Sequence, residues 1–421
     1  MRHTLPTAVV IAAALSLPAV PAAAAPDGAF TVKLVSTESP RFVTGDFALR
    51  NARAKSPYSA SVKGTVQGRA SFSKAAGPSW VRVGADGTVT GTPPASASAK
   101  TATVTVEARG ETGESTTALV RIPVRPPGAP LVPELKAMSW NLWHGGSQVE
   151  GARAKQLKFL LDTDVDVVGM QETSSTSARE LAEALGWDYY QAGSDMGVIS
   201  RYPIVSRGPL PSVSGLAGVN VKVELDERRT VSVWTAHLGY TPYGPYDACF
   251  GKWSVDRLLE REAESRRTKQ IKDLVAAMAD DLADVRRTPV LLTGDFNAPS
   301  HLDWTPATRR CGYESMPWPT SVVPEQAGFK DSYRVANPDP VAKPGVTWSP
   351  VYPTFTGGYG HDAHKGEPEP QDRIDYVLYQ GDLKVTASEA VVEGTPTAIP
   401  NHRGNAWTSD HAAVLTTFKV G

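Results

Sequence analysis

Apolar and polar residues follow two different periods along the chain, and the change of period divides the sequence into two parts. From Phe30 to Val124 they alternate at every second position, as in TATVTVEA and TALVRIPV, with turn signals such as Asp86-Gly87 between the runs. This period is typical of half-buried β-strands. We therefore predict a small all-β sandwich over residues 26–125.

From Glu134 onward, strand-like apolar runs alternate with stretches of helical spacing. Helices are predicted over 152–161, 178–185 and 255–283. Strands are predicted for LKAMSW, DVDVVGM, PVLLTG, IDYVLY and AAVLTTF, and a hairpin for VNVKVEL with TVSVWTA. This alternation predicts a mixed α/β domain over 134–421 with two packed sheets. The proline- and glycine-rich residues 126–133 are predicted to form an extended linker.

The first 25 residues have the pattern of an export signal. Arg2 and His3 precede an apolar stretch from Ala8 to Leu17, and small residues follow at 22–25. We expect cleavage after Ala25 and a secreted protein, with an uncleaved anchor as the alternative. No later run reaches the roughly 18 apolar residues of a membrane helix, so a transmembrane segment is not expected.

Composition is that of an ordinary globular protein, with 41% hydrophobic and 21% charged residues. The formal net charge of -1 predicts no strong overall attraction to polyanions, although a local basic patch stays open. Export would permit a disulfide between Cys249 and Cys311, with two free thiols as the alternative. A monomer is expected.

Polar residues capable of chemistry stand where predicted strands end. Each alone is more typical of a turn or cap than of a functional site. Together they predict a metal site, and they are Asn141, Gln171, Glu172, His237, Asp295, Asn297, Asp375, Asp410 and His411.

Hard cations such as Mg²⁺ take carboxylate and amide oxygens as ligands. Glu172 and Asp410 are the candidate carboxylate ligands, and the amide oxygen of Asn141 is the third candidate. We therefore expect Mg²⁺ as the cofactor, with Mn²⁺ as a substitute.

The remaining polar residues suit the handling of water and protons. Asp295 and Asn297 lie two positions apart, so an extended strand would place both on one face to steer a water, whereas an Asx turn would not. Asp375 lies within an apolar strand and needs a partner, for which His411 is the candidate. His237 ends another strand and would face the same site.

Two segments resemble known families. GPSWVRVGADGTVTGTPP, over Gly77–Pro94, resembles bacterial immunoglobulin-like domains, which implies that Trp80 lies in the core of the sandwich. From Glu134 to the end, the ordered motifs SWNLW, MQET, TAHL, GDFN, RIDY and SDH resemble the endonuclease/exonuclease/phosphatase superfamily. That resemblance implies a four-layered α/β sandwich, two packed sheets flanked by helices.

The resemblance also implies roles for individual residues. Asn141, Glu172 and Asp410 would form the metal and phosphate site. His411, paired with Asp375, and His237 would contact the phosphate, while Asp295, with Asn297 beside it, would orient or deprotonate the attacking water.

The sequence departs from the nucleases of that superfamily in two places. The carboxylate that pairs with the equivalent of His237 has no obvious counterpart, and Asp195 is the candidate. Residues 173–175 are Thr-Ser-Ser where some nucleases carry a basic residue, which weakens the case for duplex DNA.

The function expected from these residues is hydrolysis of phosphodiester bonds in nucleic acid, phospholipid headgroups or small diesters. The alternatives are a phosphomonoesterase on inositol-phosphate-like substrates and a non-catalytic binding protein on the same scaffold. A surface or matrix ligand is expected for the N-terminal domain, unless that domain only spaces the enzyme.

Three segments are candidates for shaping specificity. The aromatics of Tyr240–Trp253 would line the substrate rim or pack on one another. Residues 347–370 should lie near the mouth, and their HDAH sequence is either a second metal site or a polar loop. The arginine-rich stretch 257–272 is expected to be a solvated helix face, with a phosphate-binding patch as the alternative.

Overall fold

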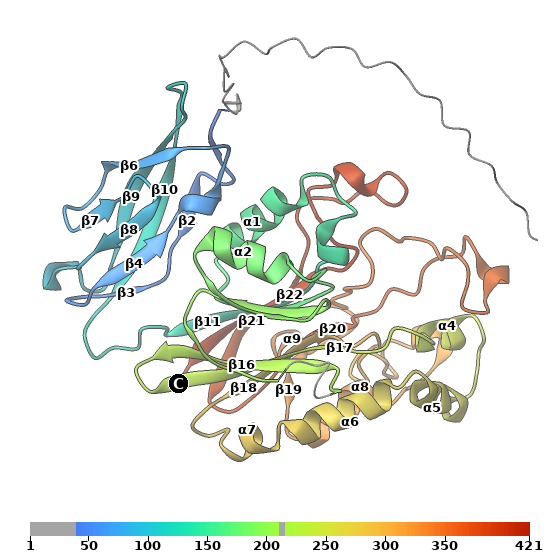
Figure 1. The fold of residues 1–421 in the computed structure, drawn as a ribbon. Coiled ribbons are helices and arrows are strands. Elements are labelled where there is room, and N and C mark those ends of the chain that lie inside the picture. The colour runs from blue at the N-terminus through green and yellow to red at the C-terminus, as the bar shows by residue number, and fades with distance from the viewer. Residues whose placement is uncertain (1–38, 210–214) are drawn as a thin grey trace, which may run out of the picture. The chain divides into compact units, whose positions relative to one another are not determined.

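The structure of the chain is a computed structural model that describes residues 39–209 and 215–421 (Figure 1). The expected export signal over residues 1–25 lies outside the described residues. Among the described helices, none has both the length and the apolar character needed to cross a bilayer.

The N-terminal region is all-β, which confirms the predicted class. Its largest sheet has the order β2-β10-β9-β6, with β3 also pairing with β10, beside a three-stranded sheet β4-β8-β7 and a pair β1-β5. Val104, Val106 and Ala108 alternate into the core of this region. The strands are β1 (Arg41–Phe42), β2 (Asp46–Ala48), β3 (Ala52–Arg53), β4 (Tyr58–Ser61), β5 (Val66–Gln67), β6 (Ser71–Ala76), β7 (Val81–Val83), β8 (Thr88–Gly91), β9 (Lys100–Arg109) and β10 (Ser115–Arg125).

Trp80 packs against the core of this region but is only partly buried. Its ring meets Tyr58 edge-on with 6.4 Å between centroids. The predicted core residue therefore lies at the margin of the core.

The α/β region contains two six-stranded sheets. The first has the order β13-β14-β12-β11-β22-β21, in which β11 pairs parallel with β12 and antiparallel with β22. The second has the order β15-β16-β17-β18-β20-β19, in which β17 pairs parallel with β18. The predicted hairpin is present as β16 and β17.

The strands of the two sheets have the following bounds. Those of the first sheet are β11 (Glu134–Asn141), β12 (Val167–Gln171), β13 (Asp188–Ala192), β14 (Met196–Ser200), β21 (Leu383–Val391) and β22 (Ala413–Val420). Those of the second are β15 (Ile204–Arg207), β16 (Gly218–Asp226), β17 (Arg229–His237), β18 (Val290–Asp295), β19 (Lys330–Asp331) and β20 (Asp375–Gln380).

The two sheets pack face to face over a core of branched aliphatic residues. Val167 of β12, Val233 of β17 and Leu291 of β18 belong to one buried cluster. Near the strand ends the sheets approach so closely that Gly169 has no room for a side chain. A Cβ there would lie 2.0 Å from Oγ1 of Thr293. This close contact brings the end of β12 next to the end of β18.

Helices cover the outer faces of both sheets (Figure 1). Helices α1 (Ala152–Thr163) and α2 (Ser177–Leu185) pack on the first sheet, with Leu160 and Leu181 buried against it. Helix α6 (Arg267–Ala277) covers the second sheet through Ile271 and Leu274. The predicted four-layered sandwich is confirmed.

The single helix predicted over 255–283 is wrong, because three helices occupy this stretch. They are α5 (Val255–Glu264), α6 and α7 (Ala279–Ala283). Arg266 separates the first two with a left-handed backbone, φ 70°. Helical spacing continues across this break, so the apolar pattern alone does not reveal it.

Shorter helices occur in the connecting segments. They are α4 (Gly244–Cys249), α8 (Pro319–Gln326), α9 (Ser332–Ala336), η1 (Lys63–Thr65), η2 (Ala95–Ala97), η3 (His144–Gly146), η4 (Arg310–Gly312), η5 (Asp362–His364) and η6 (His402–Gly404). Cys249 at the end of α4 and Cys311 in η4 form a disulfide, with 4.9 Å between their Cα atoms. The alternative of two free thiols is therefore wrong.

Arg267 departs from the expected solvated helix face, because its side chain is fully buried. It pairs with the equally buried Glu262 and donates hydrogen bonds to the carbonyls of Gly239 and Pro242. The pair thus holds the segment that follows β17. Other arginines of the stretch, such as Arg257, make exposed ion pairs as expected.

Glu262→Ala should leave the Arg267 guanidinium buried and unpaired. We expect the free energy of unfolding of the α/β region to fall by about 3–5 kcal/mol. The exposed pair Lys269–Asp273 supplies the control, since Asp273→Ala should cost less than about 1 kcal/mol. Chemical denaturation followed by tryptophan fluorescence measures both variants, and equal losses would contradict the structural role of Arg267.

Candidate active site

The polar residues expected at strand ends lie at one edge of the two packed sheets. In the first sheet Asn141 is the register partner of Gln171, and Glu172 follows directly. In the second sheet His237 pairs in register with Asp295, which pairs with Asp375. The parallel pairs β11–β12 and β17–β18 therefore deliver their last residues to the same edge.

Asn141 joins the two sheets through its side-chain amide. Its Nδ2 atom donates to Glu172 Oε1 at 3.2 Å and to Asp295 Oδ2 at 3.1 Å. Its Oδ1 atom accepts the backbone N–H of Trp143 at 2.9 Å. In this arrangement the amide oxygen is already engaged, and the NH₂ group bridges two carboxylates.

Asp295 is the centre of the site. Its Oδ2 atom lies 3.6 Å from Nε2 of His237 and 3.7 Å from Nε2 of His411. Its Oδ1 atom accepts the backbone N–H of Asn297 at 2.8 Å. The Asx turn considered for this segment is thus present, and Asn297 still lines the same pocket as Asp295.

Each imidazole has a carboxylate on its other nitrogen. His411 Nδ1 lies 2.9 Å from Asp375 Oδ2, the pairing expected from the sequence. His237 Nδ1 lies 3.0 Å from both oxygens of Asp195, the candidate partner. Such pairs fix the orientation of the ring and favour a proton on the nitrogen that faces the carboxylate.

These contacts shift the pKa values of the site. Burial raises the pKa of Asp295 to about 6, although the charge of His411 opposes the rise. Burial acts to lower the pKa of His237, but the hydrogen bond to Asp195 and the charge of Asp295 raise it to about 9. Burial likewise opposes the charged form of His411, yet Asp375 and Asp295 hold its pKa well above the usual value. At neutral pH, an ionised Asp295 therefore lies between two cationic imidazoles.

A pocket of about 280 Å³ opens over this edge of the sheets, and we call it the catalytic pocket. Glu172, His237, Asp295, Asp410 and His411 line its base. Its remaining lining residues are Trp143, His144, Tyr240, Tyr243, Tyr246, Asn297, Trp348, Tyr352, Tyr359 and Ile374.

Asp410 has a carboxylate oxygen that is suited to bind a cation. Its Oδ1 atom is buried without a hydrogen-bond partner, and burial together with the nearby Glu172 carboxylate raises its pKa to about 7 despite the charge of His411. Ser409 Oγ donates to the Asn141 carbonyl at 2.6 Å and so ties this segment to β11. A buried carboxylate that lacks a donor is suited to a divalent cation.

A second acidic group is also suited to a metal. Ligand atoms of Asp295, Asp375 and His411 lie within 4.8 Å of one another, and all three residues are buried. The Asp375–His411 contact occupies one oxygen and one nitrogen of this group, whereas Asp375 Oδ1, like Asp410 Oδ1, is buried without a hydrogen-bond partner.

Two residues of the site were not singled out by sequence reasoning, although both lie in SWNLWHGG. The backbone N–H of His144 donates to Glu172 Oε2 at 2.9 Å, and its ring Nδ1 lies 3.3 Å from the same oxygen. Trp143 and His144 both have positive φ, 51° and 54°, as does Glu172 at 55°. Non-glycine residues with a positive φ concentrate at functional sites. This backbone conformation becomes visible only in the structure.

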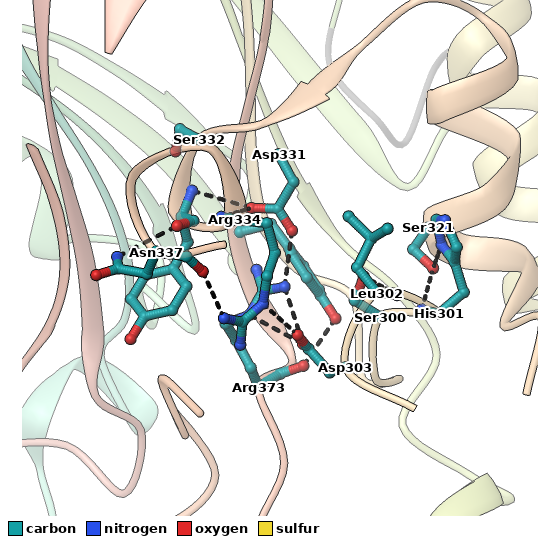
Figure 2. A network of polar contacts seen from close by, with 12 residues as sticks. Ser300, His301, Leu302, Asp303, Ser321, Asp331, Ser332, Arg334, Asn337 and Arg373 are labelled. Carbon is teal, nitrogen blue, oxygen red and sulfur yellow. Dashed lines mark hydrogen bonds and ion pairs between the residues drawn. The ribbon is translucent and has the colours of Figure 1, made fainter. Parts of the chain in front are cut away.

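A buried ionic network supports the start of β20 (Figure 2). Asp303 accepts hydrogen bonds from Arg334 Nε at 2.5 Å and from Arg373 Nε at 3.0 Å. Arg373 also pairs with Asp331 at 2.7 Å. Because Arg373 lies two residues before Asp375, this network fixes the backbone that carries the partner of His411.

The expected specificity segments contribute as follows. In Tyr240–Trp253, three tyrosines line the pocket, while Phe250 stacks on Tyr246 with 5.8 Å between centroids. The segment 347–370 contributes Trp348, Tyr352 and Tyr359 to the pocket lining. The expectation of a position near the mouth is therefore confirmed for both segments.

The HDAH sequence does not assemble a metal site among the described residues. His361 Nε2 contacts Asp247 at 2.9 Å, whereas His364 Nδ1 contacts Glu367 at 2.9 Å. The two histidines thus have separate partners, and the polar-loop interpretation holds.

Comparison with known proteins identifies the family. The family model for the Endonuclease/Exonuclease/phosphatase family matches residues 138–411, and a model for an Ig domain matches residues 40–125. The chain belongs to the endonuclease/exonuclease/phosphatase family. Members of this family are metal-dependent phosphoesterases, and the chain is an enzyme of that type.

Individual relatives match about two thirds of the chain. The uncharacterized protein F14F9.5 of Caenorhabditis elegans is 32% identical over 296 residues, which are 68% of this chain and 91% of that protein. Among solved structures, D. rerio TDP2 complexed with single-strand DNA product is 16% identical, with a TM-score of 0.44, and the match covers 68% of this chain and 98% of that one. The human Nocturnin catalytic domain with bound sulfate is 14% identical, with a TM-score of 0.43, and the match covers 70% and 97%.

The pKa values of this family member predict a bell-shaped pH dependence of phosphoester hydrolysis. Activity should rise as Asp295 ionises near pH 6 and fall as His237 loses its proton near pH 9. Asp195→Asn removes the charge that raises the His237 pKa, so the basic limb should move to lower pH while the acid limb stays. Rate measurements from pH 5 to about 10 test this, with exposed Asp256→Asn as control. An unmoved basic limb in Asp195→Asn would contradict the assignment.

Proposed function

We propose that the chain is a secreted, Mg²⁺-dependent phosphodiesterase that uses in-line attack of water. The observation that carries the proposal is the position of Asp295, whose Oδ2 lies within 3.7 Å of Nε2 of both His237 and His411. A base flanked by two proton-bearing groups can take a proton from water while its neighbours stabilise the phosphoryl oxygens.

Each residue then has a defined task. Asp295 accepts the proton of the attacking water, and Asn297 keeps its carboxylate oriented through the backbone hydrogen bond. His237 and His411 donate hydrogen bonds from Nε2 to the phosphoryl oxygens, because Asp195 and Asp375 hold the opposite nitrogens. Asn141 keeps the carboxylates of the two sheets in register.

Glu172 and Asp410 are the residues proposed to hold Mg²⁺, with Asn141 beside them. Bound there, the cation would supply Lewis-acid stabilisation of charge on the phosphate. The unpaired Oδ1 of Asp410 supports this assignment, and Mn²⁺ is expected to substitute.

The charge of the pocket supports a diester over a monoester. Neither lysine nor arginine lines the catalytic pocket within the described part of the chain. A diester brings one negative charge, whereas a monoester or an inositol polyphosphate brings more and needs more basic residues to bind it. Nucleic acid and phospholipid headgroups both contain the diester bond.

Secretion is supported by two features of the sequence. Residues 1–25 have the pattern of an export signal, and the Cys249–Cys311 disulfide suits an oxidising compartment. For the immunoglobulin-like domain outside the cell we propose a surface or matrix ligand.

Loss of either central group should remove catalysis. Asp295→Asn and His411→Ala are each expected to lower kcat on a p-nitrophenyl phosphodiester by about 10²-fold or more. His301→Ala, outside the catalytic pocket, is the matched control and should retain the wild-type rate. Wild-type rates in both site variants would refute the proposed roles.

Metal removal and product analysis test the reaction itself. Dialysis against a chelator should abolish diester hydrolysis, and added Mg²⁺ should restore it, because Asp410 and Glu172 lose their cation. A phosphomonoester should be the product. Exclusive release of inorganic phosphate from monoesters would instead establish the monoesterase alternative.

A further inference from the structure

The upper wall of the catalytic pocket is aromatic. It consists of Tyr240, Tyr246, Trp348, Tyr352 and Tyr359, which we call the aromatic cup. Trp348 stacks on Tyr352 with 5.2 Å between centroids, and Tyr246 lies 5.3 Å from Tyr359. Rings from two segments far apart in the sequence, one of which includes helix α4, therefore line one pocket.

Two members of the aromatic cup remain open to solvent. Tyr240 is 62% exposed and Tyr359 is 51% exposed, and they are the large aromatic residues among the exposed hydrophobics of the described chain. Burial of an exposed ring is favourable, so a ligand that covers these two rings would gain binding free energy.

A buried carboxylate holds the deeper rings in place. Tyr246 Oη and Trp348 Nε1 both donate to Glu369 Oε1, at 2.7 Å and 2.9 Å. Glu369 is only 5% exposed, so these polar ring atoms are turned into the protein. Trp348 is partly buried and lines the pocket, whereas Tyr246 is only 6% exposed and supports the outer rings, and the carboxylate behind both adds negative potential.

The charged groups around the aromatic cup disfavour a polyanion and favour an alkylammonium group. The charged groups of the pocket lining, as far as the structure describes it, are carboxylates and imidazoles. A polyanion such as an oligonucleotide relies on lysine and arginine to contact its flanking phosphates. An alkylammonium group instead binds to aromatic faces in a region of negative potential.

We propose that the aromatic cup binds an alkylammonium group on one arm of the phosphodiester, so that the substrate class is a phosphocholine-type diester. This inference rests on the proposed phosphodiesterase function. Hydrolysis adds water across one P–O ester bond: the hydroxyl oxygen joins phosphorus, the proton goes to the leaving alcohol, and the phosphocholine arm becomes a phosphomonoester.

The decisive experiment compares two substrates with the same leaving group. They are p-nitrophenyl phosphorylcholine and its isostere 3,3-dimethylbutyl p-nitrophenyl phosphate, in which carbon replaces the ammonium nitrogen and leaves that arm uncharged. We expect kcat/KM to be about 10-fold or more higher for the choline diester, because more than one ring of the aromatic cup would make a cation–π contact with the ammonium group. The preference should appear mainly in KM.

Variants connect the preference to the aromatic cup. Tyr240→Leu and Tyr359→Leu should each reduce the ratio of the two kcat/KM values about 3-fold or more, whereas Tyr240→Phe and Tyr359→Phe, which keep the ring, should preserve it. Val341→Ala, at an exposed hydrophobic position outside the pocket lining, is the control and should leave the ratio unchanged. Because both kcat/KM values of a variant come from the same preparation, a partial loss of folded protein does not change their ratio.

The outcomes separate this inference from the proposed function. Equal hydrolysis of both diesters by the wild type would overturn the inference and leave the phosphodiesterase intact, whereas hydrolysis of neither would overturn both. Faster cleavage of a thymidine dinucleotide than of the choline diester would also overturn the inference. Release of phosphocholine from glycerophosphocholine, or from sphingomyelin vesicles, would support it and identify the soluble or the lipid source.

Discussion

The edge of the two sheets that carries the polar residues depends on one side-chain amide, which joins the sheets. Asn141 Nδ2 contacts Glu172 at the end of the first sheet and Asp295 at the end of the second. Two carboxylates this close would repel each other in a buried site, and a shared donor reduces that cost. The absent side chain of Gly169 lets the sheets approach closely enough for the bridge to form. The packing of the core therefore also determines where the polar groups of the site lie.

Much of this arrangement was predictable from sequence because the polar residues end apolar strands. A strand carries its last residue to the edge of a sheet, so the motifs around Asn141, Glu172, His237 and Asp295 had to meet once the sheets packed. The same reasoning, applied to a carboxylate within an apolar strand, predicted the contact between Asp375 and His411.

The features that sequence reasoning missed depend on backbone conformation or on long-range contacts. Arg266 breaks a helix without interrupting its apolar spacing. The positive φ of Trp143 and His144, which lets this loop reach Glu172, has no signature in residue type. The pairing of Asp303 with Arg373 joins residues 70 positions apart and so becomes visible only in the folded chain.

The base and the wall of the catalytic pocket are formed by different structural elements. The disulfide stabilises the wall. Cys249 lies at the end of the helix that carries Tyr246, and Cys311 anchors that helix to η4. The carboxylates and imidazoles at the base of the pocket instead lie at the ends of strands or in the residues next to them, and hydrogen bonds and sheet packing hold these strands. The wall that contacts a substrate and the strands that carry the reacting groups are therefore separate structural units, so a sequence change in the wall can alter the fit of a substrate and leave those strands in place.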